Sequence, residues 1–266
     1  MIPQANITAW RKSAPWPNDA QVEQDLVISR AIVELFADPV LSAGLALRGG
    51  MSLNKLFIQP PSRYSEDIDL VQTHAGPIGP LLDMIRANLL PWLGKSASSR
   101  SHASASLTFR FESEIAPVRH LRLKIEINTR EHFSVLALQR RRLAVDNPWF
   151  ASTSEVTTYQ LDELMATKLR ALYQRRKGRD LFDLWLCIHR NAIDADRVIA
   201  CFLQYMKHEG HSVPRAEFAR NLDDKRHDPA FLGDITPLLS SAVHYDPIAA
   251  IEVVRHTLID KLPLKA

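Results

Sequence analysis

One stretch of the chain restricts its possible folds more than any other, because it combines a glycine turn with a nearby pair of aspartates. Residues 45–57 read LALRGGMSLNKLF, and residues 63–71 read RYSEDIDLV. We predict a strand, a glycine turn, a helix, a loop and a second strand over these residues. Successive side chains of a strand point to opposite faces, so Asp67 and Asp69 share one face. Two neighbouring carboxylates repel each other and favour a cation, and Mg²⁺ prefers such oxygen ligands.

The glycine turn between the two strands is a candidate site for phosphate. Gly49 and Gly50 lack a Cβ atom, so a phosphate or another backbone segment can come close. We expect Ser52 to open the next helix, whose free N–H groups and dipole attract an anion, and Lys55 to reach the same anion. Taken singly, a Gly-Gly pair is most often only a turn, and an Asp-x-Asp is most often a solvated strand end. Their succession at this spacing indicates a nucleotide site.

A third carboxylate is predicted on a later strand. Residues 120–128, HLRLKIEIN, alternate between apolar and polar side chains, which predicts a strand with one apolar face. Glu126 lies on the polar face and could join Asp67 and Asp69, either as a metal ligand or as the base that accepts a proton. The alternative is an edge strand with one solvated face.

Charged side chains also stand in apolar helical patterns farther along the chain. We predict a helix over residues 159–173, in which Lys168 falls within the apolar stripe. Its ammonium group must either extend to solvent or meet an anion, such as a phosphate or a carboxylate. Asp183 lies in a second apolar helix and needs a cationic partner, for which Lys168 is one candidate. Asp180, at the start of that helix, is expected to cap its first turn.

Several segments of this chain resemble the AbiEii/AbiGii nucleotidyltransferase toxins of abortive-infection and toxin–antitoxin systems, which include the MenT toxins. They are GGMSLNK at residues 49–55, RYSEDIDL at 63–70, KLRAL at 168–172 and RRKGRDLFDL at 175–184. The resemblance implies an α+β fold with a polymerase-β-like nucleotidyltransferase core, a small mixed sheet flanked by helices. It implies this core, with an N-terminal arm and helix, over residues 1–155, and a C-terminal helical domain over residues 156–266 that completes the active-site cleft.

The resemblance also implies an enzyme that transfers a nucleotide from an NTP. It assigns catalysis to Asp67, Asp69, Glu126, Lys168 and Asp183, of which the three acidic residues on the strands hold the metal. The residues expected to bind the nucleotide are Gly49, Gly50, Ser52, Lys55, Arg63 and Ser65. The implied cofactor is Mg²⁺, and the implied acceptor is an RNA such as the 3′ end of tRNA. Translation is then blocked by a toxin that has a cognate antitoxin as partner.

Other reactions fit the same residues. The core could transfer the nucleotide to a protein or a small molecule, it could move the γ-phosphate as a kinase does, or it could bind nucleotides without catalysis. Basic runs at residues 140–142 and 175–179 are either solvated faces or a track for an RNA backbone.

The composition is that of an ordinary globular protein. The chain has 266 residues, of which 46% are hydrophobic and 24% are charged, and its net charge is +3. No apolar run approaches the ~20 residues that cross a bilayer, and the first residues lack a signal-peptide pattern. The two cysteines, Cys187 and Cys201, lie in apolar helical contexts and are expected to be free core thiols. We therefore expect a cytoplasmic protein that does not bind membranes.

The remaining expectations concern local structure. We predict an irregular arm over residues 1–18, a helix over 81–90 that Pro91 ends, a mobile serine-rich segment over 95–102 and a β-prone run over 134–138. Further helices are predicted over residues 19–36, 194–208, 214–222 and 246–261, and a further strand over 105–111.

Overall fold

The computed structural model describes residues 2–264, and the chain divides into two compact units. The first unit holds the chain up to Ser134, together with Leu138–Tyr159 and Ser240–Ala242. The second unit holds Val135–Ala137, Gln160–Leu239 and the chain from Val243 onward. The first unit contains all the strands that the structure describes, and the second is helical.

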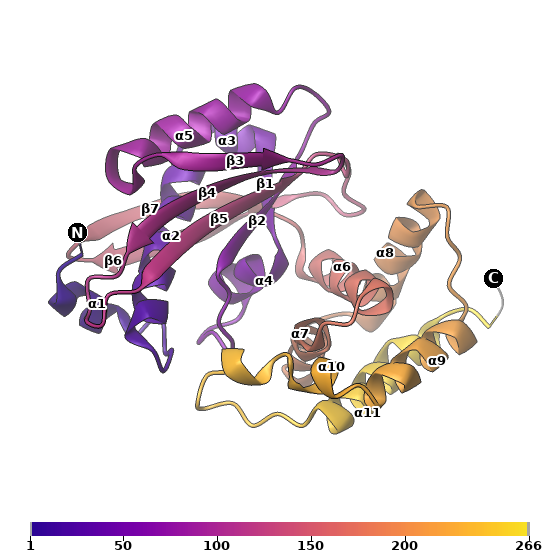
Figure 1. Ribbon diagram of the computed structural model, residues 1–266. Helices are drawn as coiled ribbons and strands as arrows, with labels where there is room; N and C mark the ends of the chain where they lie inside the picture. The colour runs from indigo at the N-terminus through magenta and orange to yellow at the C-terminus, as the bar shows by residue number, and fades with distance from the viewer. Residues whose placement is uncertain (1, 265–266) are drawn as a thin grey trace. The chain divides into compact units, whose positions relative to one another are not determined.

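A mixed sheet forms the centre of the first unit (Figure 1). Among the described residues it has seven strands in the order β3-β4-β5-β2-β1-β7-β6. Their bounds are β1 Leu45–Arg48, β2 Asp67–Gln72, β3 Ser96–Arg100, β4 Ser104–Glu112, β5 His120–Asn128, β6 Gln139–Asn147 and β7 Phe150–Thr158. Strand β2 runs parallel to β5, and β1 runs parallel to β7, whereas the other neighbouring pairs are antiparallel. Strand β5 therefore lies inside the sheet, which excludes the edge-strand alternative.

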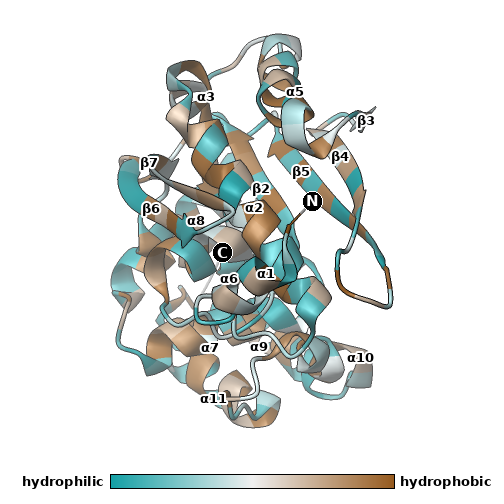
Figure 2. Cartoon of the chain, turned by 90° about the vertical axis from the view of Figure 1, so that its left-hand side faces the viewer, coloured by the Kyte–Doolittle hydropathy of each residue, from teal (hydrophilic) through white to brown (hydrophobic). Residues whose placement is uncertain are grey.

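One face of this sheet is covered by helices. The helices of the first unit are α1 Gln4–Trp10, α2 Asp19–Ala37, α3 Pro39–Gly44, α4 Gly49–Ser52 and α5 Gly79–Leu93, and a π-helical turn, η1 Leu53–Phe57, continues α4. Helix α2 packs against β7, β5 and β6, and α5 packs against α2 and β4. Leu123, Ile125 and Ile127 of β5 are fully buried. Their polar neighbours Lys124 and Glu126 belong to the opposite face, and the alternation is visible as coloured bands along the strands (Figure 2).

The N-terminal segment is ordered into a helix and fixed by a buried carboxylate, so the prediction of an irregular arm is wrong for residues 4–10. Trp10 and Trp16 donate their indole N–H groups to Asp25 of α2, over 2.8 and 3.1 Å. The ammonium group of Lys55 binds the same carboxylate at 2.6 Å. These four side chains join the first residues of the chain, α2 and the turn η1.

Three further local predictions are wrong. The serine-rich segment forms strand β3, because its backbone pairs with β4 over five residues. Pro91 lies inside α5, which continues to Leu93, and the run at residues 134–138 forms no strand. Strands β6 and β7, which were not predicted, pair over their whole length from Gln139↔Thr158 to Asn147↔Phe150.

The second unit consists of packed helices. They are α6 Leu161–Gln174, α7 Gly178–His189, α8 Ala195–His208, α9 Arg215–Arg226, α10 Pro229–Gly233 and α11 Pro247–Thr257, with 3₁₀ turns η2 Thr236–Leu238 and η3 Ile259–Lys261. Helix α6 packs against α7 and α8, and α7 packs against α11. The predicted stripe of α6 is buried at Leu164, Met165, Leu169 and Leu172. Within the described residues, no helix has the length and apolar character that crossing a membrane requires.

Replacement of Asp25 tests the buried cluster that fixes the N-terminal segment. Asp25→Ala removes the acceptor of two indoles and leaves the Lys55 ammonium buried without its anion, so we expect a loss of about 3 kcal/mol in the free energy of unfolding. Urea unfolding followed by tryptophan fluorescence measures it. The control is Asp83→Asn, because the Asp83 side chain is 75% exposed in its pair with Arg86, and its loss should stay within about 0.5 kcal/mol. Equal losses in the two variants would contradict the assignment.

Candidate active site

Three neighbouring strands bring the predicted acidic residues onto one face of the sheet. Arg48 of β1 lies opposite Asp69 of β2, and Asp69 lies opposite Glu126 of β5. Two residues earlier on each of these two strands, Asp67 lies opposite Lys124. Residues in register on adjacent strands share a face, so the three carboxylates and the two basic side chains form one polar patch.

Asp67 has a carboxylate oxygen that its surroundings do not compensate. Its Oδ1 atom is buried and has no hydrogen-bond partner among the described residues. Burial raises the pKa of Asp67 above its usual value, and the charges of Glu66 and Asp69 raise it further. A buried carboxylate oxygen without a donor is costly unless a cation or a proton compensates it.

Lys124 supplies positive charge inside this patch. Its ammonium group binds Oε2 of Glu126, and this hydrogen bond raises the pKa of Lys124, as do the charges of Asp67 and Asp69. The sequence places Lys124 on the polar face of its strand, but it does not show that the strand register sets it directly opposite Asp67. Sequence reasoning therefore gave this residue no role.

The donor set suits a divalent metal ion, although the side chains are not gathered around one point. Asp67, Asp69 and Glu126 offer only oxygen atoms, as Mg²⁺ prefers. Within the described part of the chain, no three His, Cys, Asp or Glu side chains form a group that could hold a metal ion. Lys124 accounts for this in part, because its ammonium group occupies the carboxylate of Glu126.

The glycine turn is closely packed by two side chains from the β2 segment. Gly49 has a φ of +75°, and a Cβ atom there would overlap Oδ2 of Asp69. A Cβ atom at Gly50 would overlap the guanidinium group of Arg63. Helix α4 begins at Gly49 and not at Ser52, so the prediction that Ser52 opens the helix is wrong. The glycines thus allow a carboxylate and a guanidinium group to reach the backbone at the start of this helix.

The other residues predicted to bind the nucleotide have partners within the first unit. Ser52 is fully buried, and its hydroxyl lies 2.8 Å from that of Thr158. Lys55 is bound to Asp25, as described above. Arg63 is buried and donates to the carbonyl oxygen of Tyr64, whereas Ser65 is half-buried in the segment that enters β2. Phosphate binding by these side chains stays a prediction.

Arg48 is a further candidate that sequence reasoning missed. Arg48 is a candidate because it lies at the end of β1, opposite Asp69. Its guanidinium group binds Glu131 at 2.7 Å, and Glu131 comes shortly after the end of β5. The ion pair holds a cation beside the carboxylate patch. The sequence feature that could have indicated this role is that Arg48 directly precedes the glycine turn.

The second unit contains a separate buried ion cluster. Lys168 lies 2.9 Å from Asp183 and 3.2 Å from Asp180, and both carboxylates are fully buried. Arg175 binds Asp180 through two nitrogens, at 2.8 and 3.0 Å. The pairing of Lys168 with Asp183 was one of the predicted possibilities. The capping role predicted for Asp180 is wrong, because its side chain binds Lys168 and Arg175 and caps no helix.

The basic runs are largely engaged in ion pairs or spread along an edge strand. In the second unit, Arg176 pairs with Asp228 at 3.3 Å, and Lys177 lies 3.6 Å from Asp234. In the first unit, residues 140–142 are exposed on β6, the last strand of the sheet. Charged side chains on an edge strand protect it from pairing with other chains. The ion pairs and the edge position agree with solvated faces, and the RNA-track interpretation of these runs stays a prediction.

Comparison with known proteins decides the family. The family model described as nucleotidyl transferase AbiEii toxin, type IV toxin–antitoxin system, matches residues 30–252. This chain belongs to the AbiEii family. The family assignment confirms the resemblance found in the sequence, and it makes the protein a nucleotidyltransferase of a toxin family.

One solved structure supports the fold. MenT4, a nucleotidyltransferase toxin from Mycobacterium tuberculosis H37Rv, matches with a TM-score of 0.63 at 16% identity, over 98% of this chain and 91% of that chain. An antigenic nucleotidyltransferase-like protein from Paracoccidioides brasiliensis matches with a TM-score of 0.39 at 16% identity, over 80% of this chain and 94% of that chain. No curated protein sequence matches. The predicted α+β class, with a nucleotidyltransferase core and a helical part, is confirmed.

The glycine turn gives a direct test of the site geometry. Gly49→Ala places a side chain at a positive φ and against the Asp69 carboxylate, so we expect a loss of about 1–3 kcal/mol in the free energy of unfolding. The control is Gly79→Ala, because Gly79 begins α5 and a Cβ atom there meets nothing within 4 Å. That variant should be neutral or slightly stabilised. Chemical denaturation compares the two, and a Gly49 variant as stable as the control would refute the geometry.

The ion cluster of the second unit predicts a pH dependence. Burial alone would raise the pKa of Asp180, but Lys168 and Arg175 outweigh burial and lower it. A carboxylate with a lowered pKa stabilises the fold above pH ~4, and this stability is lost as the pH falls through its folded pKa. Asp180→Asn should therefore cost about 3 kcal/mol at neutral pH, and the cost should shrink below pH ~4.

Urea unfolding of the wild type and the Asp180 variant between pH 3 and pH 7 measures this difference. Asp196→Asn serves as the control, because the Asp196 side chain is 81% exposed in its pair with Lys261. Its difference from the wild type should be small at every pH. A cost for Asp180→Asn that does not change with pH would show that the charge of Asp180 is not what stabilises the cluster.

Proposed function

We propose that this protein transfers a nucleotide from an NTP to an RNA acceptor in a Mg²⁺-dependent reaction, and that the acceptor is the 3′ end of tRNA. The observation that carries the reaction type is the buried, unpartnered Oδ1 of Asp67 on a face shared with Asp69 and Glu126. The family supports nucleotidyl transfer by a toxin. The RNA acceptor and the block of translation rest on the resemblance of the sequence motifs to this family.

Asp67 and Asp69 would hold the metal ion, and Glu126 would complete the set or act beside it. When bound, Mg²⁺ lowers the pKa of the attacking hydroxyl and offsets the charge of the leaving pyrophosphate. Burial and the charges of Glu66 and Asp69 raise the pKa of Asp67, and its buried oxygen without a donor supports a cation at this point of the sheet.

Glu126 is the proposed acceptor of the proton from the 3′-hydroxyl of the RNA. The ammonium group of Lys124 donates a hydrogen bond to this carboxylate and holds the side chain of Glu126 in place. This role for Lys124 as a positioning residue rests on its place two residues before Glu126, on the same face of β5.

The triphosphate is proposed to bind at the turn formed by Gly49 and Gly50. The Asp69 carboxylate already lies against Gly49, which supports a place for an anionic oxygen at the start of α4. Arg48 and Lys124 lie on the same face and would offset the phosphate charge. Ser52 and Lys55 would act mainly by fixing the turn, since both are held by buried partners.

Lys168 and Asp183 belong to the second unit, and their catalytic roles are also part of the proposal. Lys168 would stabilise the negative charge that develops on the phosphates, and Asp183 would keep its ammonium group in place. A cognate antitoxin, as expected for a toxin of this family, is the proposed protein partner. A cytoplasmic location is consistent with two buried free thiols, Cys187 and Cys201.

One incubation tests the reaction and its acceptor. The protein is mixed with Mg²⁺, each NTP in turn and separate pools of total tRNA, protein and small molecules, with the label on either the α- or the γ-phosphate. We expect α-label, and not γ-label, to enter the tRNA pool. Entry of γ-label would show a kinase, and α-label in another pool would show a different acceptor.

Replacement of both strand aspartates tests the metal assignment. Asp67→Asn with Asp69→Asn should lower NTP turnover at least a thousandfold, because the metal contributes several kcal/mol to the transition state. The free energy of unfolding should not fall, because the fold penalises the charged form of Asp67. Asp83→Asn is the control, since the Asp83 side chain on α5 is 75% exposed and should not affect turnover. Retained turnover, or an unfolded double variant, would count against the assignment.

A further inference from the structure

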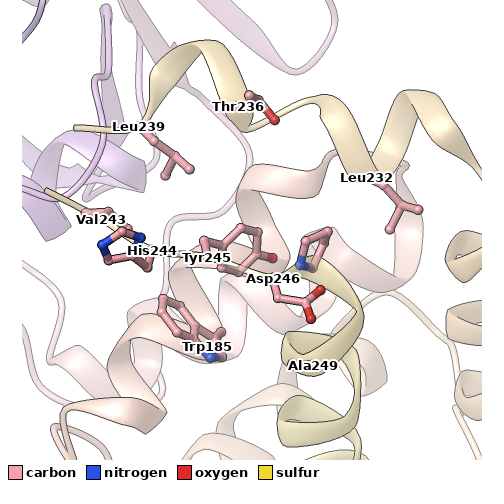
Figure 3. Close-up of a pocket in the computed structure, with 10 residues that line it drawn as sticks. Trp185, Leu232, Thr236, Leu239, Val243, His244, Tyr245, Asp246 and Ala249 are labelled. Carbon is pink, nitrogen blue, oxygen red and sulfur yellow. The ribbon is translucent and has the colours of Figure 1, made fainter. Parts of the chain in front are cut away.

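The second unit contains a pocket of about 690 Å³ that is separate from the ion cluster (Figure 3). Its walls come from α7, from the segment α10–η2 and from the segment that begins α11. The residues that matter for the argument are Trp185, Leu232, Thr236, Leu239, Tyr245 and Asp246. The volume lies within the range of ~300–1,000 Å³ that is typical of small-ligand sites.

Two aromatic side chains form a fixed platform in this pocket. The rings of Trp185 and Tyr245 meet edge to face, with centroids 5.1 Å apart. His189 stacks on Trp185 with ring centroids 5.3 Å apart and planes at 15°, and Phe182 contacts Tyr245 with centroids 5.0 Å apart. These contacts leave little freedom to either ring, while Trp185 stays half-buried and lines the pocket. A rigid, accessible indole offers a planar ligand a surface for stacking.

The pocket also contains polar groups that suit a planar, hydrogen-bonding ligand. The hydroxyl of Tyr245 is buried and has no hydrogen-bond partner among the described residues. Burial, together with the charges of Asp183 and Asp246, raises the pKa of Tyr245. Asp246 caps α11 by accepting from the N–H of Ile248 at 2.8 Å, and its carboxylate lines the pocket as an acceptor.

We propose that this pocket binds one unpaired base of the RNA acceptor, and that it favours a base with an exocyclic amine over uracil. Every nucleobase can stack on an aromatic ring, and the exocyclic amines of adenine, cytosine and guanine can donate to a carboxylate such as that of Asp246, whereas uracil has no such amine. The inference rests on the proposed function, because it gives the RNA substrate its binding site.

The location of the pocket supports this assignment. Phe182 and Trp185 both come from α7, the helix that carries Asp183, and the charge of Asp183 acts on Tyr245. Asp183 in turn binds Lys168. The pocket therefore shares helix α7 with Asp183, one of the two residues of this unit that are proposed to act in catalysis.

Substitution of Trp185 tests the stacking. The full-length protein is titrated into short fluorescein-labelled RNAs, one of adenosine and cytidine and one of uridine only, and anisotropy gives the Kd. Trp185→Leu should weaken binding of the first RNA about tenfold or more, and Trp185→Phe should retain most of it. Trp149→Leu is the matched control, because Trp149 is a half-buried tryptophan of the first unit and should leave the Kd unchanged.

Substitution of Asp246 tests the base preference without removing the helix cap. Asparagine caps a helix about as well as aspartate, so Asp246→Asn should keep α11 folded. The preference for the RNA of adenosine and cytidine over the uridine RNA should fall about tenfold. An unchanged Kd in Trp185→Leu, an equal loss in Trp149→Leu, or an unchanged base preference in Asp246→Asn would overturn the proposal.

The same proteins separate failure of the pocket from failure of the proposed function. If the wild type labels RNA and Trp185→Leu does so with the same KM for RNA, the pocket assignment is wrong and the function stands. If RNA binding depends on Trp185 but no RNA receives the α-label, the pocket stands and the proposed reaction is wrong. If the wild type neither binds nor labels RNA, both are wrong, and a protein segment becomes the alternative occupant.

Discussion

Repulsion between like charges on one sheet face is the constraint on which the proposed active site depends. The register of β1, β2 and β5 sets Asp69 between Arg48 and Glu126 and sets Asp67 opposite Lys124. Arg48 faces Asp69 and Lys124 faces Asp67 across neighbouring strands, whereas Asp69 and Glu126 lie side by side. Asp67 keeps one oxygen buried without a hydrogen-bond donor. The uncompensated negative charge of the patch is therefore concentrated at one atom.

Lysine residues satisfy buried carboxylates in both units. Lys55 meets Asp25, which two indoles also contact, and Lys168 lies between Asp180 and Asp183. A buried charge that loses its partner is strongly destabilising, so these lysines contribute to the fold before they contribute to any reaction. A lysine one turn after a glycine pair is first expected to bind a phosphate. Lys55 instead has a structural role, because it binds Asp25. For Lys168 the structural and catalytic roles are compatible, since an ammonium group held in place can also stabilise phosphate charge.

The match to MenT4 shows how little sequence identity this fold requires. The two chains share 16% of their residues over nearly their whole length, with a TM-score of 0.63. Strand alternation and helical stripes can be maintained by many apolar residues, so identity falls while the fold remains. The aromatic pocket of the second unit adds a feature of a different kind, because it combines a stacking surface with a donor and an acceptor that the core does not need.

The sequence alone determined the elements that have strong periodicity. Alternation set strand 120–128 and placed Asp67 and Asp69 on one face, and the apolar stripe set helix α6 with Lys168 inside it. The motif pattern was also sufficient to indicate the family. Serine-rich β3 and the arginine-rich β6 lack such a pattern, and each becomes a strand because a neighbouring strand completes its hydrogen bonds.

Only the tertiary structure decided which charged groups meet. The pairs Lys55–Asp25 and Arg48–Glu131 join residues far apart in the chain, and the pairing of β2 with β5 sets Asp67 against Lys124. Hydrophobic periodicity shows which side of an element is buried, but it contains no information on which distant element covers that side. The pocket at Trp185 depends in the same way on segments 232–239 and 243–249 coming together over α7. Local sequence therefore sets the faces, and chain folding sets the partners.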